Sequence, residues 1–423
     1  MQFIDGGVTA PFGFTANGIL CGIKAGRTKN DVALVFSEKP CSAAGVFTQN
    51  KVKAESVKLT KKNIADGKAQ AVIANSGNAN ACTGPQGAEN ALRMAKAAAR
   101  VLHINAEDVV VCSTGVIGQQ LPVEVIEKNI DRLASGLSKE GHEEARTAIM
   151  TTDTNYKECA VETVIGGKKV HIGAMCKGSG MIHINLGTML AFMTTDCAIS
   201  SAMLEKALRK SIEGTYNCVS VDGDTSTNDT LTILANGMAG NKEITEEGKD
   251  FDDFYEALNA INTQMAKKIA GDGEGASRLI ECNVKGAKDV PTARRLAKSV
   301  ISSSLVKAAF FGKDANWGRI LCAMGYSGEE FTPEKTSISF RSIEGAKRHG
   351  FTDLMGDNKG NEDSIMVFDH GVPLDFDEVK AKKILSEDEV TIDVLLEDGD
   401  ASGTAWGCDL TYDYVKINGD YRT

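Results

Sequence analysis

The sequence predicts a mixed α/β fold, because apolar runs rich in β-branched residues alternate with segments of helical periodicity. Residues 32–37 and 70–74 are short apolar runs of the kind found in buried strands. Residues 88–102 are rich in alanine and place apolar residues at helical spacing. Strands and helices are therefore both expected in the first quarter of the chain.

A β-hairpin is expected next, because two strand-like runs, 159–165 and 169–175, flank Gly166-Gly167. The second run leads into the loop Lys177-Gly178-Ser179-Gly180, and a further extended segment is expected over 189–194. The hairpin should thus place this loop at the end of a strand.

The second half of the chain carries further helical and strand patterns. Residues 201–213 and 251–270 predict amphipathic helices, and Pro291 favours the start of a helix over 291–305. The residues expected to form the buried stripe of 251–270 are Phe254, Leu258, Ile261, Met265 and Ile269. Short strands are expected at 337–340 and 390–396, and we expect a second, smaller unit near 280–400.

Composition and charge exclude several classes of protein. The net charge of −10 over 423 residues argues against a surface for nucleic acid or anionic membranes. Short clusters such as Lys51-Val52-Lys53 and Lys61-Lys62 are expected on solvated faces, although an exposed cluster could steer an anionic cosubstrate. No apolar run approaches the roughly 20 residues that span a bilayer, and the first residues lack the pattern of a signal peptide. We therefore expect no membrane partner.

The cysteines and histidines show no metal-binding pattern. Eleven cysteines, an odd number, occur without a CxxC pair, which favours free thiols in a reducing compartment and hence a cytoplasmic protein. The six histidines have no HExxH spacing. We predict neither a metal site nor a bound cofactor.

Gly187-Thr188 is the candidate reaction centre, since it lies between a glycine-rich loop and the apolar run 189–193. The Thr188 hydroxyl could attack the carbonyl of Gly187, and hydrolysis of the ester would leave Thr188 as a new N-terminus. Its α-amine, with a pKa of about 7.7–8.0, could then accept a proton near neutral pH. Threonine activated by its own amine is an established nucleophile, although a threonine before a strand is more often an edge hydroxyl.

Longer motifs favour the nucleophile. Lys177-Gly-Ser-Gly-Met181, followed by Asn185 and by Gly187-Thr-Met-Leu-Ala-Phe192 and Thr194-Thr-Asp196, resembles the self-cleavage segment of the ornithine acetyltransferase / glutamate N-acetyltransferase family of arginine biosynthesis. Other blocks occur in that family's order at 45–54, 75–84, 113–118, 151–154, 220–230, 273–276, 311–321 and 404–418, with a terminal Thr423. The resemblance therefore spans nearly the whole chain.

The resemblance implies roles for specific residues. Thr188 would be the nucleophile, and Thr114 and Gly115 would form the oxyanion hole that stabilises the negative charge of the tetrahedral intermediate. The residues that match the family's substrate-binding positions are Thr154, Lys177, Thr188, Glu274, Asn418 and Thr423. In this assignment Lys177 is a suitable cation to bind the substrate carboxylate, and Glu274 can bind the ammonium group of ornithine.

The resemblance also implies the fold, activity and assembly. It implies a layered α/β sandwich, cleavage into an α chain 1–187 and a β chain 188–423, and a heterotetramer of two α and two β chains. The implied reaction moves acetyl from N-acetylornithine to glutamate by a ping-pong mechanism through acetyl-Thr188, and acetyl-CoA is a further candidate donor. Two alternatives remain, an amidohydrolase or aminopeptidase with the same threonine and an uncleaved, non-catalytic paralogue.

The sequence also shows one departure from the family's pattern and two motifs that resemble other functional sites. His183-Ile184 stands where the family usually has Ala-Pro, and we expect no catalytic role for His183. The run 222–229 resembles a calcium loop but has Ile233 where a bidentate Glu is needed, so a turn held by Asx-type hydrogen bonds is expected. Ser179 lacks the G-x-S-x-G context of a hydrolase nucleophile.

Overall fold

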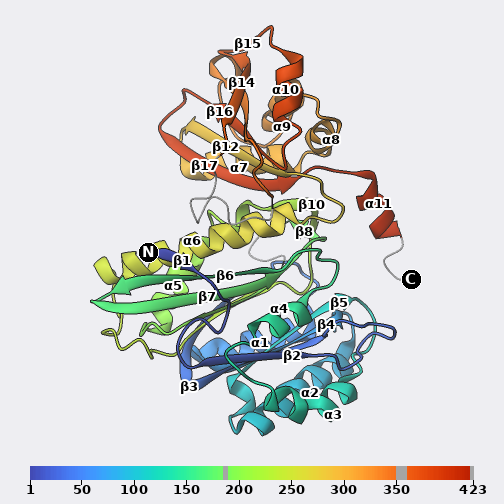
Figure 1. Ribbon diagram of the computed structural model, residues 1–423, viewed down its shortest axis with the longest axis vertical. Coiled ribbons are helices and arrows are strands. Elements are labelled where there is room, and N and C mark those ends of the chain that lie inside the picture. The colour runs from blue at the N-terminus through green and yellow to red at the C-terminus, as the bar shows by residue number, and fades with distance from the viewer. Residues whose placement is uncertain (184–188, 349–359, 420–423) are drawn as a thin grey trace. The chain divides into compact units, whose positions relative to one another are not determined.

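The computed structural model describes residues 1–183, 189–348 and 360–419, and the chain forms two compact units (Figure 1). The first unit comprises Met1–Gly178, Asn185–Glu213 and Thr225–Met265. The second comprises Ser179–Ile184, Gly214–Asp224 and Ala266–Thr423. The cut between residues 187 and 188 and the boundary near 280–400 stay predictions.

A nine-stranded mixed sheet forms the frame of the first unit, as far as the described residues extend, with the order β1-β6-β7-β9-β11-β3-β4-β5 and with β2 paired to β3. The pairs β9–β11 and β4–β5 are parallel, and the other neighbours are antiparallel. The strands are β1 (Gln2–Ile4), β2 (Phe14–Ile19), β3 (Val32–Phe47), β4 (Lys68–Asn78), β5 (Val109–Val116), β6 (Lys157–Ile165), β7 (Lys168–Lys177), β9 (Leu190–Thr195) and β11 (Thr230–Ala235).

Strand β3 joins the two halves of this sheet. Its first half pairs with β2 and β4, and its second half pairs with β11. Because successive side chains of a strand point to opposite faces, Val32 and Leu34 pack with the helices α2 and α3, whereas Ala33 and Val35 pack with α4 (Figure 1). The α-helices that lie wholly within this unit, among the described residues, are α1 (Glu55–Asn63), α2 (Gly84–Leu102), α3 (Val123–Ser135), α4 (His142–Ile149) and α5 (Ser201–Ile212).

The second unit is built on a six-stranded sheet with the order β15-β14-β13-β16-β12-β17, and β8 pairs with β10 in a separate ladder. Its strands are β8 (Ile182–His183), β10 (Ser220–Thr225), β12 (Leu279–Ala287), β13 (Ser337–Ile343), β14 (Glu362–Asp369), β15 (Val372–Pro373), β16 (Glu389–Leu395) and β17 (Ala401–Cys408). Its helices are α7 (Val290–Ser302), α8 (Ser304–Gly312), α9 (Trp317–Gly325), α10 (Glu378–Ile384) and α11 (Tyr412–Gly419). The mixed α/β class is confirmed.

Most of the expected elements are present. β6 and β7 form the hairpin around Gly166-Gly167, whose φ angles of 55° and 76° lie in the left-handed region that glycine tolerates. Helix α6 (Lys249–Gly271) buries all five residues of its expected apolar stripe completely. No helix in the described ranges is long and apolar enough to cross a membrane.

Two expected elements differ from the structure in more than their bounds. The helix predicted over 291–305 is two helices, α7 and α8, because Ser303 takes an extended conformation and its hydroxyl accepts the N–H of Val306 as a cap. The turn predicted over 222–229 begins as strand β10, although Asp222 does make the expected Asx-type bond to the Asp224 N–H. In both places a hydroxyl or carboxylate bonds to the backbone of its own segment.

Candidate active site

The residues that follow the predicted nucleophile are fixed inside the central sheet. Gly187 and Thr188 lie outside the described residues, and the chain resumes at Met189. The Met189 carbonyl accepts the N–H of Thr230 at 2.9 Å, and Leu190 pairs with Lys177 on one side and with Thr230 on the other. Met189 and Leu190 are both buried. The chain therefore enters β9 at a defined register between β7 and β11.

Lys177 is the last residue of β7 and is only 8% exposed. Its buried ammonium group affects the pKa values of two nearby carboxyl groups, those of Asp153 and Asp229. The next residue, Gly178, donates its N–H to the Asp153 carboxylate at 2.8 Å. A strand end and a buried charge network thus hold the predicted substrate-binding cation in place.

Asp153 and Lys157 form a buried ion pair, with 2.6 Å between Oδ1 and Nζ. Burial raises the pKa of the Asp153 carboxyl, but the fields of Lys157 and Lys177 outweigh it and hold the pKa well below its usual range. The neighbouring Thr154 is exposed, and its hydroxyl accepts a hydrogen bond from Asn155. This predicted binding residue is therefore anchored through the buried aspartate beside it.

Asp229 is a residue that sequence reasoning missed. It immediately precedes β11, its side chain is 2% exposed, and Oδ2 has no hydrogen-bond partner among the described residues. Burial raises the pKa of this carboxyl well above its usual value. Hydrogen bonding with Ser226, Thr48 and the Met189 backbone, together with the charge of Lys177, opposes that shift only in part. One signal was available, namely an acidic residue directly before a strand of β-branched and apolar residues, Thr230–Ala235. A buried aspartate rarely lacks a partner or a role.

Asn228, also missed, connects this point to the predicted oxyanion hole. Its side-chain amide donates to the carbonyl groups of Ala79 and Ser113, at 2.6 and 2.7 Å. Ser113 directly precedes Thr114. The Asn228-Asp229 pair therefore lies between the end of β5 and the start of β9.

Thr114 and Gly115 lie near the end of β5 and are half-buried. Gly115 has a φ of +135°, and a Cβ there would lie 2.3 Å from the carbonyl carbon of Gly77 on β4. Only glycine fits this close approach of two strands. The structure thus brings Thr114, Gly115, Lys177 and Met189 into one unit around Asn228-Asp229.

The second unit contains Glu274 and Asn418, and these two residues are in contact. The Asn418 amide donates to Glu274 Oε2 at 2.7 Å, and Glu274 is 6% exposed. A Cβ on Gly180 would lie 2.2 Å from Glu274 Oε2, so the glycine allows the carboxylate to approach the loop. The Ser179 hydroxyl is buried and donates to the Asp272 carbonyl. Thr423 lies outside the described residues.

His183 and Asp222 support the other side of this loop. The Asp222 carboxylate accepts the N–H groups of Met181 and Ile182, at 2.6 and 2.8 Å. His183 Nδ1 lies 3.0 Å from Ser220 Oγ, and burial together with the charge of Lys298 lowers the pKa of the imidazole to about 4. In the described ranges, no group of three His, Cys, Asp or Glu side chains is placed to hold a metal ion.

Comparisons with known proteins agree on one family. Residues 15–423 match the ArgJ family. The chain is 49% identical, over 423 residues and the full length of both chains, to the arginine biosynthesis bifunctional protein ArgJ of Caldanaerobacter subterraneus subsp. tengcongensis.

Two crystal structures are also similar. The arginine biosynthesis bifunctional protein argJ of Bacillus halodurans is 43% identical, covering 55% of this chain and 99% of that one, with a TM-score of 0.48. Ornithine acetyltransferase of Mycobacterium tuberculosis, solved with ornithine, is 40% identical, covering 44% and 98%, with a TM-score of 0.41. The match to the family over residues 15–423 and the 49% identity over the full chain show that this chain belongs to the ArgJ family.

Proposed function

We propose that this protein transfers an acetyl group from N-acetylornithine to glutamate through an acetyl-Thr188 intermediate, after cleavage of the Gly187–Thr188 bond. The observation that carries the proposal is the placement of Met189. The residue after the nucleophile is held in the central sheet, beside Lys177 and beside an Asn228-Asp229 pair that also binds the strand bearing Thr114 and Gly115. The curated relative at 49% identity carries the name of an arginine biosynthesis bifunctional protein.

The first half-reaction forms an ester. Thr188 Oγ attacks the acetyl carbonyl carbon, and the α-amine of Thr188 accepts the hydroxyl proton. The Thr114 hydroxyl and the Gly115 N–H are the proposed donors to the oxyanion. When the intermediate collapses, the C–N bond breaks and ornithine leaves with the proton on its amine. Acetyl-Thr188 remains.

The second half-reaction regenerates the enzyme. The free amine of glutamate attacks the ester carbonyl carbon, and the proton lost by that amine returns to Thr188 Oγ as the C–O bond breaks. Lys177 is the proposed partner of the substrate carboxylate, and its burial strengthens this attraction relative to a surface lysine. Glu274, Asn418, Thr154 and Thr423 are the other proposed binding groups.

Intact mass spectrometry tests the processing step. The wild type should give two fragments that begin at residue 1 and at Thr188, and Thr188→Ala should give one full-length chain. An uncut wild-type chain with full transferase activity would refute the terminal-amine mechanism. An uncut and inactive wild-type chain would instead identify a non-catalytic paralogue.

Acetyl labelling tests the chemistry and separates transferase from hydrolase. N-acetylornithine alone should add one acetyl group to the fragment that begins at Thr188, and glutamate should remove it as N-acetylglutamate. Double-reciprocal plots should be parallel lines. Release of free acetate at the same rate with and without glutamate would establish a hydrolase.

Cytoplasmic location, the heterotetramer of two α and two β chains, and the use of acetyl-CoA are further parts of the proposal. The eleven cysteines are all free, which supports a reducing compartment. Native mass spectrometry of the cleaved protein would give the number of each chain in the assembly.

A further inference from the structure

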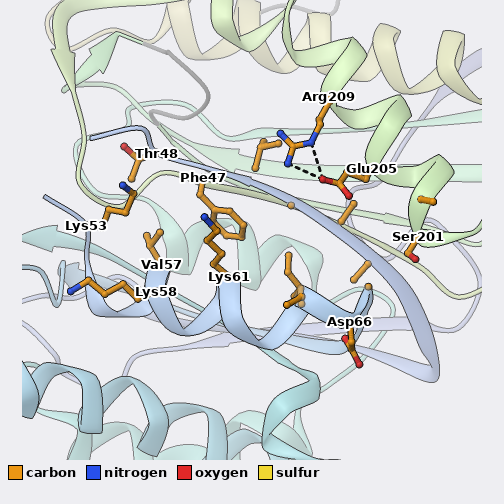
Figure 2. Close-up of a pocket in the computed structure, with 18 of the residues that line it drawn as sticks. Phe47, Thr48, Lys53, Val57, Lys58, Lys61, Asp66, Ser201, Glu205 and Arg209 are labelled. Carbon is orange, nitrogen blue, oxygen red and sulfur yellow. Dashed lines mark hydrogen bonds and ion pairs between the residues drawn. The ribbon is translucent and has the colours of Figure 1, made fainter. Parts of the chain in front are cut away.

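A groove of about 660 Å³ lies in the first unit between helix α1, helix α5 and the second half of β3 (Figure 2). The apolar residues that line it include Phe47, Val57 and Ile64. A Cβ on Gly45 would lie 2.7 Å from Ile64 Cδ1 and 3.1 Å from Phe47 Cζ. The glycine therefore lets these two side chains close over the strand, and together they form a surface against which an organic ligand can pack.

The groove is basic although the whole chain is acidic. Four cationic side chains and two anionic ones line it, whereas the net charge of the chain is −10. The cations are Lys53, Lys58, Lys61 and Arg209, and the anions are Asp66 and Glu205. A local excess of positive charge in a concave surface attracts anions more strongly than a flat surface does.

Two of these cations are already neutralised, and two are not. Arg209 forms an ion pair with Glu205 at 2.8 Å, and Lys58 forms one with Glu55 at 2.7 Å. Lys53 and Lys61 form no ion pair with any described residue. Figure 2 shows both on the side of the groove where Phe47 and Thr48 lie. The unpaired positive charge is thus concentrated at that end.

The same end of the groove is connected to the candidate active site. Thr48 lines the groove, its N–H donates to the Asp229 carbonyl at 3.0 Å, and its hydroxyl donates to the Ser226 carbonyl at 2.7 Å. Asp229 in turn precedes Thr230, which bonds to Met189. A ligand held by Lys53 and Lys61 would therefore lie beside the loop that contacts the residue after Thr188.

We propose that this groove binds the phosphate groups of a small organic molecule, with Lys53 and Lys61 as the phosphate ligands and Phe47 and Ile64 as the apolar contact. Lysine binds phosphate as a point charge, and a phosphate group, with about −1.5 to −2 charge at pH 7, matches two unpaired ammonium groups better than a single carboxylate does. The ring of Phe47 favours a ligand that also has an apolar part. Two sources carry this chemistry, namely a phosphorylated acyl donor such as acetyl-CoA and a free nucleotide or pyrophosphate. If the ligand is an acyl donor, the proposal rests on the proposed function. Phosphate binding by the groove does not depend on that function.

The test compares two double variants that remove the same charge. Lys53→Gln with Lys61→Gln removes the unpaired cations, and Lys51→Gln with Lys62→Gln removes exposed neighbours that do not line the groove. Binding of pyrophosphate, ADP and CoA to the cleaved, assembled protein is measured by calorimetry. We expect the first variant to weaken binding roughly tenfold and the second less than about twofold, with a steeper salt dependence in the wild type.

Activity assays identify the source of the phosphate. If the ligand is an acyl donor, the groove variant should raise the KM for acetyl-CoA and leave transfer from N-acetylornithine unchanged. If ADP or pyrophosphate binds and acetyl-CoA is not used, the groove binds a free phosphorylated molecule. Absence of binding of all three probes at millimolar concentration, or equal losses in the two variants, would overturn the proposal. Failure of transfer from N-acetylornithine with probe binding intact would refute only the proposed function.

Discussion

In the first unit, Asp153 and Asp229 are buried to a similar degree, at 5% and 2% exposure, but their pKa values shift in opposite directions. Asp153 has the Lys157 ammonium group at 2.6 Å and the Gly178 N–H at 2.8 Å. Asp229 has hydroxyl and backbone contacts, and no ion pair to it is found among the described residues. Because burial disfavours both carboxylates, the adjacent cation decides which one stays ionised.

The Asp153 region and the Asp229 region therefore provide carboxyl groups in different protonation states. The Asp153 region holds a fixed negative charge that is matched by two lysines. The Asp229 region holds a carboxyl group that keeps its proton to higher pH and has one unpartnered oxygen. Of the following four changes, Lys157→Met and Asp229→Asn test this contrast directly, and the other two test groups that should not alter it. They are given in order of decreasing effect.

Lys157→Met should destabilise the fold most. It leaves the Asp153 charge buried without its nearest cation, which typically costs about 3–5 kcal/mol. Urea denaturation at pH 7 measures the free energy of unfolding. Lys169→Met, at a side chain that is 70% exposed and pairs with Glu162, is the matched control and should cost under about 1 kcal/mol. Equal costs for the two variants would show that burial of the pair is unimportant.

Thr114→Ala should lower kcat by about 10²–10³, equivalent to roughly 2.7–4 kcal/mol of transition-state stabilisation. The change leaves the Asp153–Lys157 pair intact, so the free energy of unfolding should remain near that of the wild type. Steady-state kinetics with N-acetylornithine and glutamate measures the effect. A rise in KM at constant kcat would assign Thr114 to uniform substrate binding instead.

Asp229→Asn should change the pH dependence of stability. A carboxyl whose pKa is raised on folding binds its proton more tightly in the native state, so stability falls as the pH rises from about 4 towards the folded pKa. The slope contributed by this one group reaches about 1.4 kcal/mol per pH unit. The amide removes it, and the wild-type and variant curves should diverge with rising pH. Parallel curves for the wild type and the variant would contradict the raised pKa of Asp229.

His183→Gln should have the smallest effect. Because the folded pKa of His183 is lowered to about 4, the imidazole is neutral in both states above pH 7.5 and stabilises the fold less as the pH falls below about 6.5. The kcat profile between pH 6 and 9 should be the same in variant and wild type. A lost ionisation in that range would assign His183 a proton-transfer role.

Helices and strands whose apolar residues recur with a clear period could be predicted from the sequence. The hairpin around Gly166-Gly167 and the buried stripe of α6 were predicted because spacing alone determines which face is apolar. The break at Ser303 was missed because the apolar pattern continues through it. The full length of β3 was missed because three polar residues and a proline, at 37–40, interrupt its alternation, although the backbone stays extended.

The candidate site was predictable in its residue types but not in its connections. The motif similarity supplied Thr114, Gly115, Lys177 and Glu274 as candidates. It could not supply Asn228 and Asp229 as the link between Lys177 and the strand that bears Thr114 and Gly115, since an acidic residue after a polar run is typical of a turn. Burial, pairing and pKa also depend on residues distant in sequence, such as Lys177 and Gly178, which act on the Asp153 carboxylate. These relations become visible only when the strands are placed.

The order of the nine-stranded sheet has a consequence for chain separation. Strands β9 and β11 belong to the proposed β chain, yet they lie between β7 and β3, which belong to the proposed α chain. Cleavage at residue 188 would therefore leave a two-strand insert clamped on both sides by backbone hydrogen bonds to the other product. Dissociation of the cut chains would expose four sheet edges, a state prone to aggregation. The two halves expressed separately should be insoluble, and coexpression from two genes should restore a soluble pair.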